Sequence, residues 1–134
     1  MYVAKMRPFM YVAHPYNAET HEERVKNIEN AMKWSTQLAL TGLVIPIAPW
    51  IEITSVIGNT EKDFCLELDV DTVAQCDILI LTGGRISPGM KIEQDASTEH
   101  GIWCIDATHF GYSSPSVDIL REWLRTIGIW CLNA

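Results

Sequence analysis

Three residues in the second half of the chain have the types and spacing needed for chemistry: Ser87, Gly89 and Glu93. Serine followed by Pro88 is typical of a helix start, with serine as the N-cap and proline in the first helical position. The free N–H groups and the dipole at such a helix start favour an anion, above all a phosphate. Glu93 follows Gly89 by one turn on the same helix face, where a missing side chain leaves room for a ligand to approach the carboxylate. The pattern predicts an anion site at Ser87 and a reactive carboxylate about one and a half turns further along the helix.

The segment before this helix supports the same interpretation. Residues 78–81 form an apolar run that suits a strand buried on both faces, and Gly83 and Gly84 then break it. A strand, a glycine turn and a helix in this order place the turn at the carboxyl edge of a parallel sheet, where ligands bind. The competing interpretation is structural: such turns are often plain connections, and a glutamate in the second turn of a helix is usually solvated.

The rest of the chain alternates between strand and helix patterns. We expect strands at 9–13, 43–47, 78–81 and 102–105, and helices at 21–40, 63–75, 88–99 and 116–127. Residues 51–62 have no clear pattern apart from a turn at Gly58-Asn59, and 128–134 suit a short fifth strand or a packed tail. Proline at position 46 favours an edge position for the second strand.

This alternation predicts one α/β domain over residues 1–134, a flavodoxin-like (Rossmann-like) three-layer sandwich with a parallel sheet of four or five strands. We expect the first strand at the centre of the sheet, with the second and third strands on either side of it. A ligand crevice should then lie between residues 11–17 and residues 83–93.

Composition limits the classes of partner. The chain has 134 residues and a net charge of −7, which argues against a nucleic acid polymer or an anionic membrane as the main partner. No apolar segment approaches the ~20 residues that span a bilayer. The four cysteines show no metal-ligand spacing, so we expect reduced thiols, a cytoplasmic location and no metal or organic cofactor.

Several short motifs, taken together and in order, resemble the nucleoside 2-deoxyribosyltransferase superfamily, and in particular its branch of 2′-deoxynucleoside 5′-monophosphate N-glycosidases. The resemblance spans about residues 9 to 107 and includes the end of the first strand, Tyr-Val-Ala-x-Pro. Its most specific part is the joint spacing of Asp69, Asp77, Ser87, Gly89 and Glu93.

The resemblance implies a role for each matching residue. Glu93 matches the nucleophile that attacks C1′ of the sugar, and Asp69 matches the acid that assists beside the base. Tyr11 matches a tyrosine that holds the catalytic carboxylate. Ser87 stands where nucleoside-specific members have an aspartate, and the serine implies a 5′-phosphate on the substrate. This agrees with the residues themselves, because a carboxylate would repel the phosphate whereas a hydroxyl at a helix start would not.

Other candidates for substrate binding follow from position. Arg24 and Arg85 are the basic residues available for a phosphate, although Arg24 also suits a surface ion pair. His14 stands where relatives commonly have glycine and is expected to narrow the pocket or contact the base. Asn17 is near the ligand by position, and Trp50 follows the second strand and could cover a base. Competing structural interpretations are a core position for Tyr11, an exposed one for Asp69 and a strand cap for Asp77.

We therefore expect an enzyme that hydrolyses, or transfers from, the N-glycosidic bond of a nucleotide, most simply a 2′-deoxynucleoside 5′-monophosphate. That chemistry requires an ionised Glu93 and a protonated Asp69. The resemblance also implies a homodimer or higher homo-oligomer in which a neighbour completes the pocket. Two alternatives stay open: a non-catalytic nucleotide-binding or sensing module on the same fold, and a phosphoribohydrolase-like enzyme acting on ribonucleotides.

Overall fold

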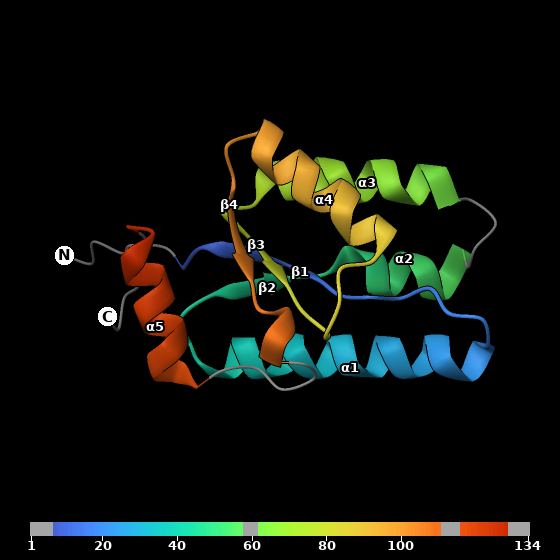
Figure 1. The fold of residues 1–134 in the computed structure, drawn as a ribbon, viewed down its shortest axis with the longest axis horizontal. Helices are drawn as coiled ribbons and strands as arrows, with labels where there is room; N and C mark the ends of the chain where they lie inside the picture. The colour runs from blue at the N-terminus through green and yellow to red at the C-terminus, as the bar shows by residue number, and fades with distance from the viewer. Residues whose placement is uncertain (1–6, 58–61, 111–115, 129–134) are drawn as a thin grey trace.

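Four parallel strands form the sheet of a computed structural model, which describes residues 7–57, 62–110 and 116–128 (Figure 1). The strands are β1 (Phe9–Ala13), β2 (Ile45–Ile47), β3 (Ile78–Leu81) and β4 (Trp103–Asp106), in the order β2-β1-β3-β4. β1 pairs with both neighbours, so that Tyr11 lies opposite Ile47 on one side and Leu79 on the other. The predicted central position of the first strand and edge position of the second are confirmed.

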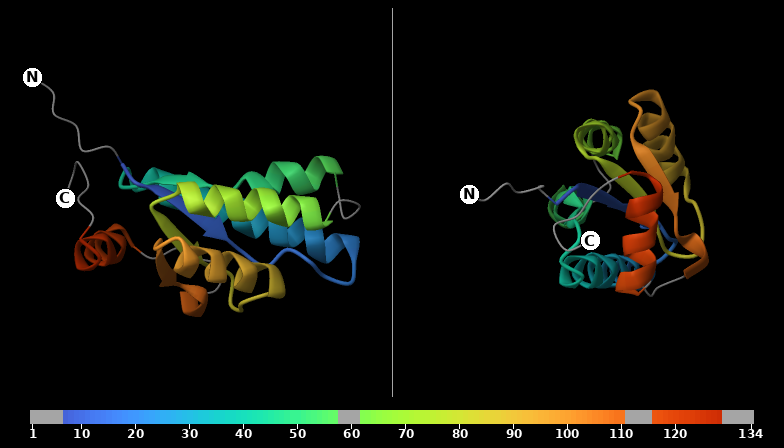
Figure 2. Two further views of the ribbon diagram at one scale, coloured as in Figure 1. Left: turned by 90° about the horizontal axis from the view of Figure 1, so that it is seen from above. Right: turned by 90° about the vertical axis from the view of Figure 1, so that its left-hand side faces the viewer.

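Helices cover both faces of this sheet (Figures 1 and 2). They are α1 (His21–Leu40), α2 (Pro49–Ile57), α3 (Lys62–Gln75), α4 (Pro88–Glu99) and α5 (Val117–Thr126), and a short 3-10 helix, η1, spans Thr108–Phe110. The predicted three-layer, flavodoxin-like arrangement is therefore confirmed. None of the helices in the described part of the chain is long and apolar enough to cross a membrane.

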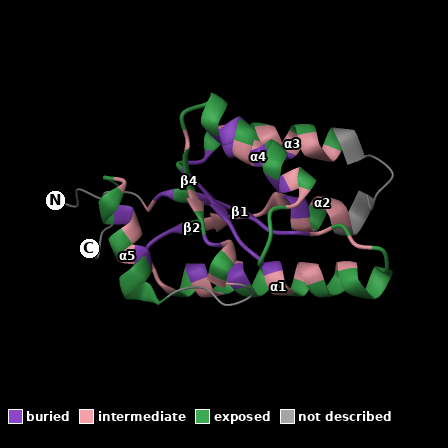
Figure 3. Cartoon of the chain, viewed as in Figure 1, coloured by how far each residue is buried: buried purple, intermediate pink, exposed green. Residues whose placement is uncertain are grey.

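The central strands are buried along most of their length (Figure 3). Their alternate residues belong to two separate cores, one for each face of the sheet. Met10 and Val12 point toward α1 and α5, where they pack with Trp34 and Leu120. Tyr11 and its alternating partners point the other way, toward α2, α3 and α4. Because helices cover both faces, β1 and β3 are apolar without interruption, as parallel strands usually are.

The structure corrects several element boundaries. β2 begins at Ile45 rather than at 43, and β4 begins at Trp103 rather than at 102. β4 is an edge strand whose Trp103 side chain is largely exposed, so it is not a buried strand like β3. Much of the unassigned stretch 51–62 belongs to helices α2 and α3. The expected turn at Gly58-Asn59 and the expected strand or packed tail at 129–134 lie outside the described residues.

Helix α1 buries only some of its apolar side chains. Val25 and Met32 are apolar, but both side chains are exposed. The buried residues are Ala31, Trp34 and Leu38, and the Trp34 indole belongs to the core beneath the sheet. Thr20 is the N-cap of this helix, and its hydroxyl accepts a hydrogen bond from the Glu23 N–H at 3.1 Å.

The Trp34 face of α1 gives the first prediction. Trp34→Ala should lower the free energy of unfolding by about 3–5 kcal/mol, because it removes a fully buried indole and leaves a cavity. Met32→Ala, two residues away on the exposed face, should change it by less than about 0.5 kcal/mol. Urea titrations of both variants measure the difference, and equal losses would contradict the assignment of the inward face.

Candidate active site

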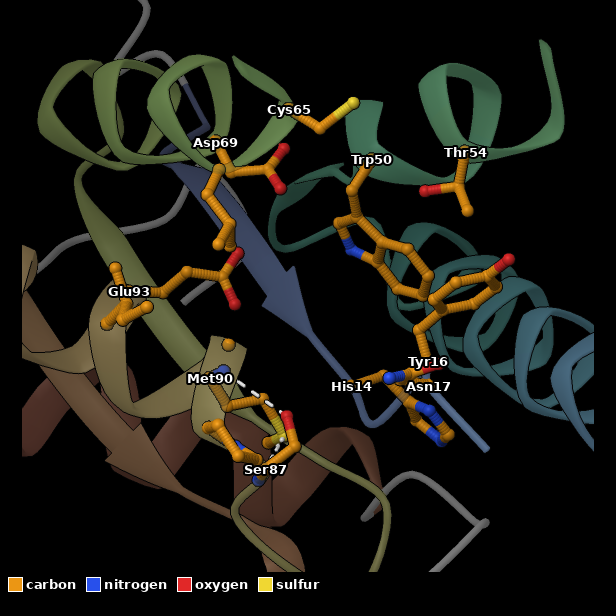
Figure 4. Close-up of a pocket in the computed structure, with 14 residues that line it drawn as sticks. His14, Tyr16, Asn17, Trp50, Thr54, Cys65, Asp69, Ser87, Met90 and Glu93 are labelled. Atoms are coloured by element: carbon orange, nitrogen blue, oxygen red, sulfur yellow. Dashed lines mark hydrogen bonds between the residues drawn. The ribbon is translucent and has the colours of Figure 1, made fainter. Parts of the chain in front are cut away.

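A cavity of about 320 Å³ lies at the carboxyl edge of the sheet, where β1 and β3 end (Figure 4). That volume is at the lower end of the range usual for small-molecule sites. Its walls come from the β1–α1 loop and from helices α2, α3 and α4. The predicted site residues that line it are His14, Asn17, Trp50, Asp69, Ser87, Gly89 and Glu93.

Two buried carboxyl groups form one side of the cavity. Glu93 on α4 is 6% exposed and Asp69 on α3 is 7% exposed, and Figure 4 shows both groups pointing into the cavity opposite the Trp50 ring. Burial raises the pKa of Glu93 to about 8, and the charge of Asp69 adds to the rise. Burial likewise raises the pKa of Asp69 to about 6. Neither carboxyl group is exposed, so the structural interpretation of Glu93 and Asp69 as solvated surface residues is wrong.

Tyr11, fully buried on β1, is the third member of this cluster. Burial, and then the charges of Glu93 and Asp69, raise the pKa of its phenol well above the usual value, so the hydroxyl stays a neutral donor. Its interaction with the two carboxyl groups lowers the pKa of each. Even so, the Tyr11 hydroxyl and Asp69 Oδ1 have no hydrogen bond of full geometry to any described residue. Buried polar atoms of this kind are rare, and a water, an ion or a ligand usually completes them.

The raised pKa values bear on the protons that catalysis requires. Burial raises the pKa of both groups, and that of Glu93 further than that of Asp69, so the pair retains a proton at neutral pH. Two carboxyl groups in one buried space cannot both ionise cheaply, so they share a proton as a pair. The pair therefore holds one proton between about pH 6 and pH 8.

Ser87 caps α4 at the cavity, as its position predicted. Its Oγ accepts a hydrogen bond from the Met90 N–H at 3.2 Å, and its own N–H donates to Met90 Sδ at 3.4 Å. The first turn of α4 thus presents its amino end to the cavity, with the favourable potential for an anion that accompanies it. Gly89 follows in this turn, and a Cβ placed there would meet only Leu66 Cδ2, at 3.8 Å. The space over the first turn of α4 is therefore open.

Trp50 supplies an aromatic wall. Its Nε1–H donates to the Val12 carbonyl at 2.9 Å, which fixes the indole against the end of β1. The Tyr16 ring lies beside it, with ring centroids 6.2 Å apart and planes tilted by 59°. A flat apolar ligand has a large surface to contact here.

His14 is a buried part of the wall. Nδ1 and the Pro15 carbonyl are 2.8 Å apart, and since a carbonyl only accepts, Nδ1 carries the proton. Burial lowers the pKa of the imidazole, which is therefore neutral at pH 7. The predicted narrowing of the pocket by His14 agrees with this position.

The two arginines expected at a phosphate do not line the cavity. The Arg24 guanidinium donates to the Ala18 carbonyl at 2.8 Å and so holds the β1–α1 loop. Arg85 is exposed and reaches the Asn17 carbonyl at 3.5 Å, at the outer rim. Asp77 lies at the opposite, amino edge of the sheet, where it accepts from the Phe9 N–H at 2.8 Å; its strand-capping interpretation is confirmed.

Four further lining residues, Tyr16, Pro88, Met90 and Ile92, lie within the expected crevice segments 11–17 and 83–93. Thr54, Cys65 and Leu66 also line the cavity and were not anticipated from the sequence. Thr54 was not predicted as a lining residue because the sequence analysis did not assign helix α2. Pro49, which precedes an apolar run, is a helix-start signal that could have indicated this helix. Within the described ranges, no group of three or more His, Cys, Asp or Glu side chains is placed to hold a metal ion.

The fold and the cavity together define a parallel α/β domain with a buried carboxyl pair at the carboxyl edge of its sheet. A family model described as a domain of unknown function, DUF7768, matches residues 8–106, and the chain belongs to this family. The matched segment contains the whole sheet and every residue that lines the cavity. A search of curated proteins finds no significant match.

The shared proton makes a prediction about stability. The pKa of Glu93 is raised on folding, from an ordinary value near 4.5 to about 8, so the folded chain binds more protons and its stability falls as pH rises between these values. Glu93→Gln should therefore stabilise the fold more at pH 8.5 than at pH 5, by an amount on the order of a few kcal/mol. Denaturant titrations at the two pH values measure this, and an equal effect at both would contradict the raised pKa.

The open space at Gly89 leads to a second prediction about stability. Gly89→Ala should leave the free energy of unfolding unchanged or raise it by up to about 1 kcal/mol, since alanine favours helix and meets no close neighbour. Gly84→Ala is the matched control, since that site is equally uncrowded but has φ +82°. It should cost about 1–2 kcal/mol because a left-handed backbone disfavours a side chain. Thermal unfolding of both variants decides, and a destabilised Gly89→Ala would mean that the space over α4 is closed.

Proposed function

We propose that this protein cleaves the N-glycosidic bond of a nucleotide, by hydrolysis or by transfer, and that its substrate is a 2′-deoxynucleoside 5′-monophosphate. The observation that carries the proposal is the buried pair of Glu93 and Asp69, with Tyr11 beside it, facing a cavity next to a helix N-terminus. Buried carboxyl pairs with raised pKa values, set in a cavity, are typical of catalytic sites.

The sugar carbon would lie over Glu93. A Glu93 oxygen attacks C1′ as the C1′–N bond breaks, and the bonding electrons leave with the base, which takes a proton from Asp69. The glycosyl ester that results is then released by water, or by another base in a transfer reaction. The Tyr11 hydroxyl donates to the carboxylate and orients it, since its raised pKa keeps it protonated.

This chemistry needs the proton on Asp69 rather than on Glu93. The pair already holds one proton at neutral pH, so the reactive form requires only its transfer from one carboxyl to the other. Because burial raises the pKa of Glu93 further than that of Asp69, this transfer is unfavourable in the free protein. Positive charge developing on the sugar favours an ionised Glu93 and offsets that cost. Activity should accordingly be greatest where the pair holds one proton, between about pH 6 and 8.

The two ends of the cavity suit the two ends of a nucleotide. The amino end of α4, with the Ser87 hydroxyl, offers a favourable dipole to the 5′-phosphate, and Arg85 stands at the rim nearby. The Trp50 indole, on the opposite side from the carboxyl pair, suits the face of a base.

A second candidate is a module that binds a nucleotide without cleaving it. The observation that favours it is the deep burial of Glu93, which raises the pKa of its carboxyl group and favours the neutral form, a poor nucleophile. The same cavity and the same contacts to phosphate and base would serve such a module.

Incubation with a panel of deoxy- and ribonucleoside 5′-monophosphates, followed by chromatography for free base, tests the proposal. The wild type should release base from at least one 2′-deoxynucleotide, faster than from its ribo counterpart. Glu93→Gln should reduce release by at least about a thousandfold, as loss of a nucleophile usually does, while nucleotide affinity changes little.

The matched control is Glu99→Gln, at the exposed end of the same helix, which should keep wild-type release. Binding of nucleotides without any release of base would overturn the enzymatic proposal in favour of the binding module. Faster release from ribonucleotides would overturn the choice of a deoxyribose substrate.

A further inference from the structure

The β1–α1 loop and the turn after β3 touch each other at one end of the cavity. A Cβ placed on Gly83 would lie 2.6 Å from Pro15 Cδ and 2.7 Å from His14 Nε2, so the two loop residues occupy the space that glycine leaves. Gly83 has φ +91°, which independently favours glycine there. The buried His14 ring therefore packs closely against the backbone of Gly83, which leaves no room for a side chain at that position.

Hydrogen bonds hold the His14 ring in this place. Thr82, next to Gly83, donates to the Ala13 carbonyl twice, from its N–H at 2.9 Å and from its hydroxyl at 2.7 Å. The His14 Nδ1–H donates to the Pro15 carbonyl at 2.8 Å, and the ring is only 5% exposed. A ring so fixed is a rigid part of the cavity wall and not a side chain free to swing aside.

This wall stands at the anion end of the cavity. Gly83 begins the turn that leads into the Ser87 cap, and His14 and Ser87 line the same cavity. Across the rim, Arg85 reaches from this turn to the Asn17 carbonyl and joins the two loops again. A phosphate at the amino end of α4 would therefore lie in the cavity that the imidazole also borders.

We propose that the His14 ring, seated on Gly83, closes this end of the cavity and restricts the ligand's anionic group to a single phosphate. The inference rests on the proposed function, since it concerns the 5′ end of the same nucleotide. It makes His14 a specificity-determining residue that selects monophosphates over diphosphates.

Volume and charge both support the selection. A second phosphate on the same side would need the space that the imidazole fills. It would also add negative charge where the described lining residues include no lysine or arginine. The imidazole is itself neutral, because burial lowers its pKa and the Arg85 charge lowers it further. A buried charge without a partner is costly, so the larger anion is disfavoured.

The experiment measures affinities for 2′-deoxynucleoside monophosphates and for the diphosphates of the same bases, by calorimetry. All chains carry Glu93→Gln so that no ligand is consumed. With His14 intact, monophosphate should bind at least about tenfold more tightly than diphosphate, a degree of discrimination that a close-fitting wall can supply.

Two substitutions open the wall. His14→Asn keeps a donor for the Pro15 carbonyl and removes the part of the ring nearest Gly83, whereas His14→Ala removes the whole ring. Both should bring the ratio of the two affinities toward one, with the larger effect in His14→Ala. His100→Asn, the same change on the exposed end of α4, is the matched control and should keep the ratio.

Thermal unfolding identifies any variant that has lost its fold. We expect His14→Asn to be the more stable of the two variants, because it keeps the donor to the Pro15 carbonyl. An unchanged ratio in folded His14→Asn and His14→Ala would overturn the inference, as would equal affinities with His14 intact. Either result leaves the proposed function standing, because that depends on release of base by the wild type. Tight monophosphate binding without release of base in the wild type would overturn the enzyme and leave the selection by His14 intact.

Discussion

The burial of two carboxyl groups in one cavity is the constraint on which the rest of this structure depends. Glu93 and Asp69 lie on different helices, and each is more than nine-tenths buried. Such a pair is unfavourable when both groups are ionised, so it retains a proton and destabilises the fold as pH rises. The surrounding structure has to be rigid enough to hold the pair together against this cost.

The rigidity comes from the sheet and from the helices packed on one of its faces. Helices α3 and α4 lie side by side, and Val73, Met90 and Ala96 fasten them to the strand residues beneath. Tyr11 lies on the sheet side of the carboxyl pair, because β1 is central and its alternate residues face these helices. The carboxyl pair, which destabilises the fold as pH rises, thus lies on the fully buried residues of the central strands.

Hydrogen bonds from polar side chains hold the loops around the cavity, and the same side-chain types could instead have bound a ligand. Arg24 and Asn27 on α1 donate to the carbonyls of Ala18 and Tyr16, and Trp50 donates to that of Val12. A guanidinium or an amide suits a loop carbonyl as well as it suits a phosphate. Which of the two it meets is decided by distance in the folded chain, and at Arg24 the loop carbonyl is the nearer partner.

The sequence by itself determined the alternation of strands and helices and the cap at Ser87. Both depend on local chemistry: apolar runs, an N-cap hydroxyl and proline at a helix start. The central place of β1 followed from that alternation, which is typical of a parallel sheet. Prediction from the sequence failed at α2, where Ile51, Ile53 and other β-branched residues favour a strand while tertiary packing of Trp50 imposes a helix.

The tertiary structure alone decided which side chains share an environment. The sequence placed Glu93 and Asp69 on two helices, but only the packing of α3 on α4 shows that both are buried and that burial raises the pKa of each. The tertiary structure also placed His14 against Gly83 and left Arg24 outside the cavity. The physical reason is that pKa, burial and contact depend on neighbours distant in the chain, whereas strands, turns and caps are set by residues a few positions apart.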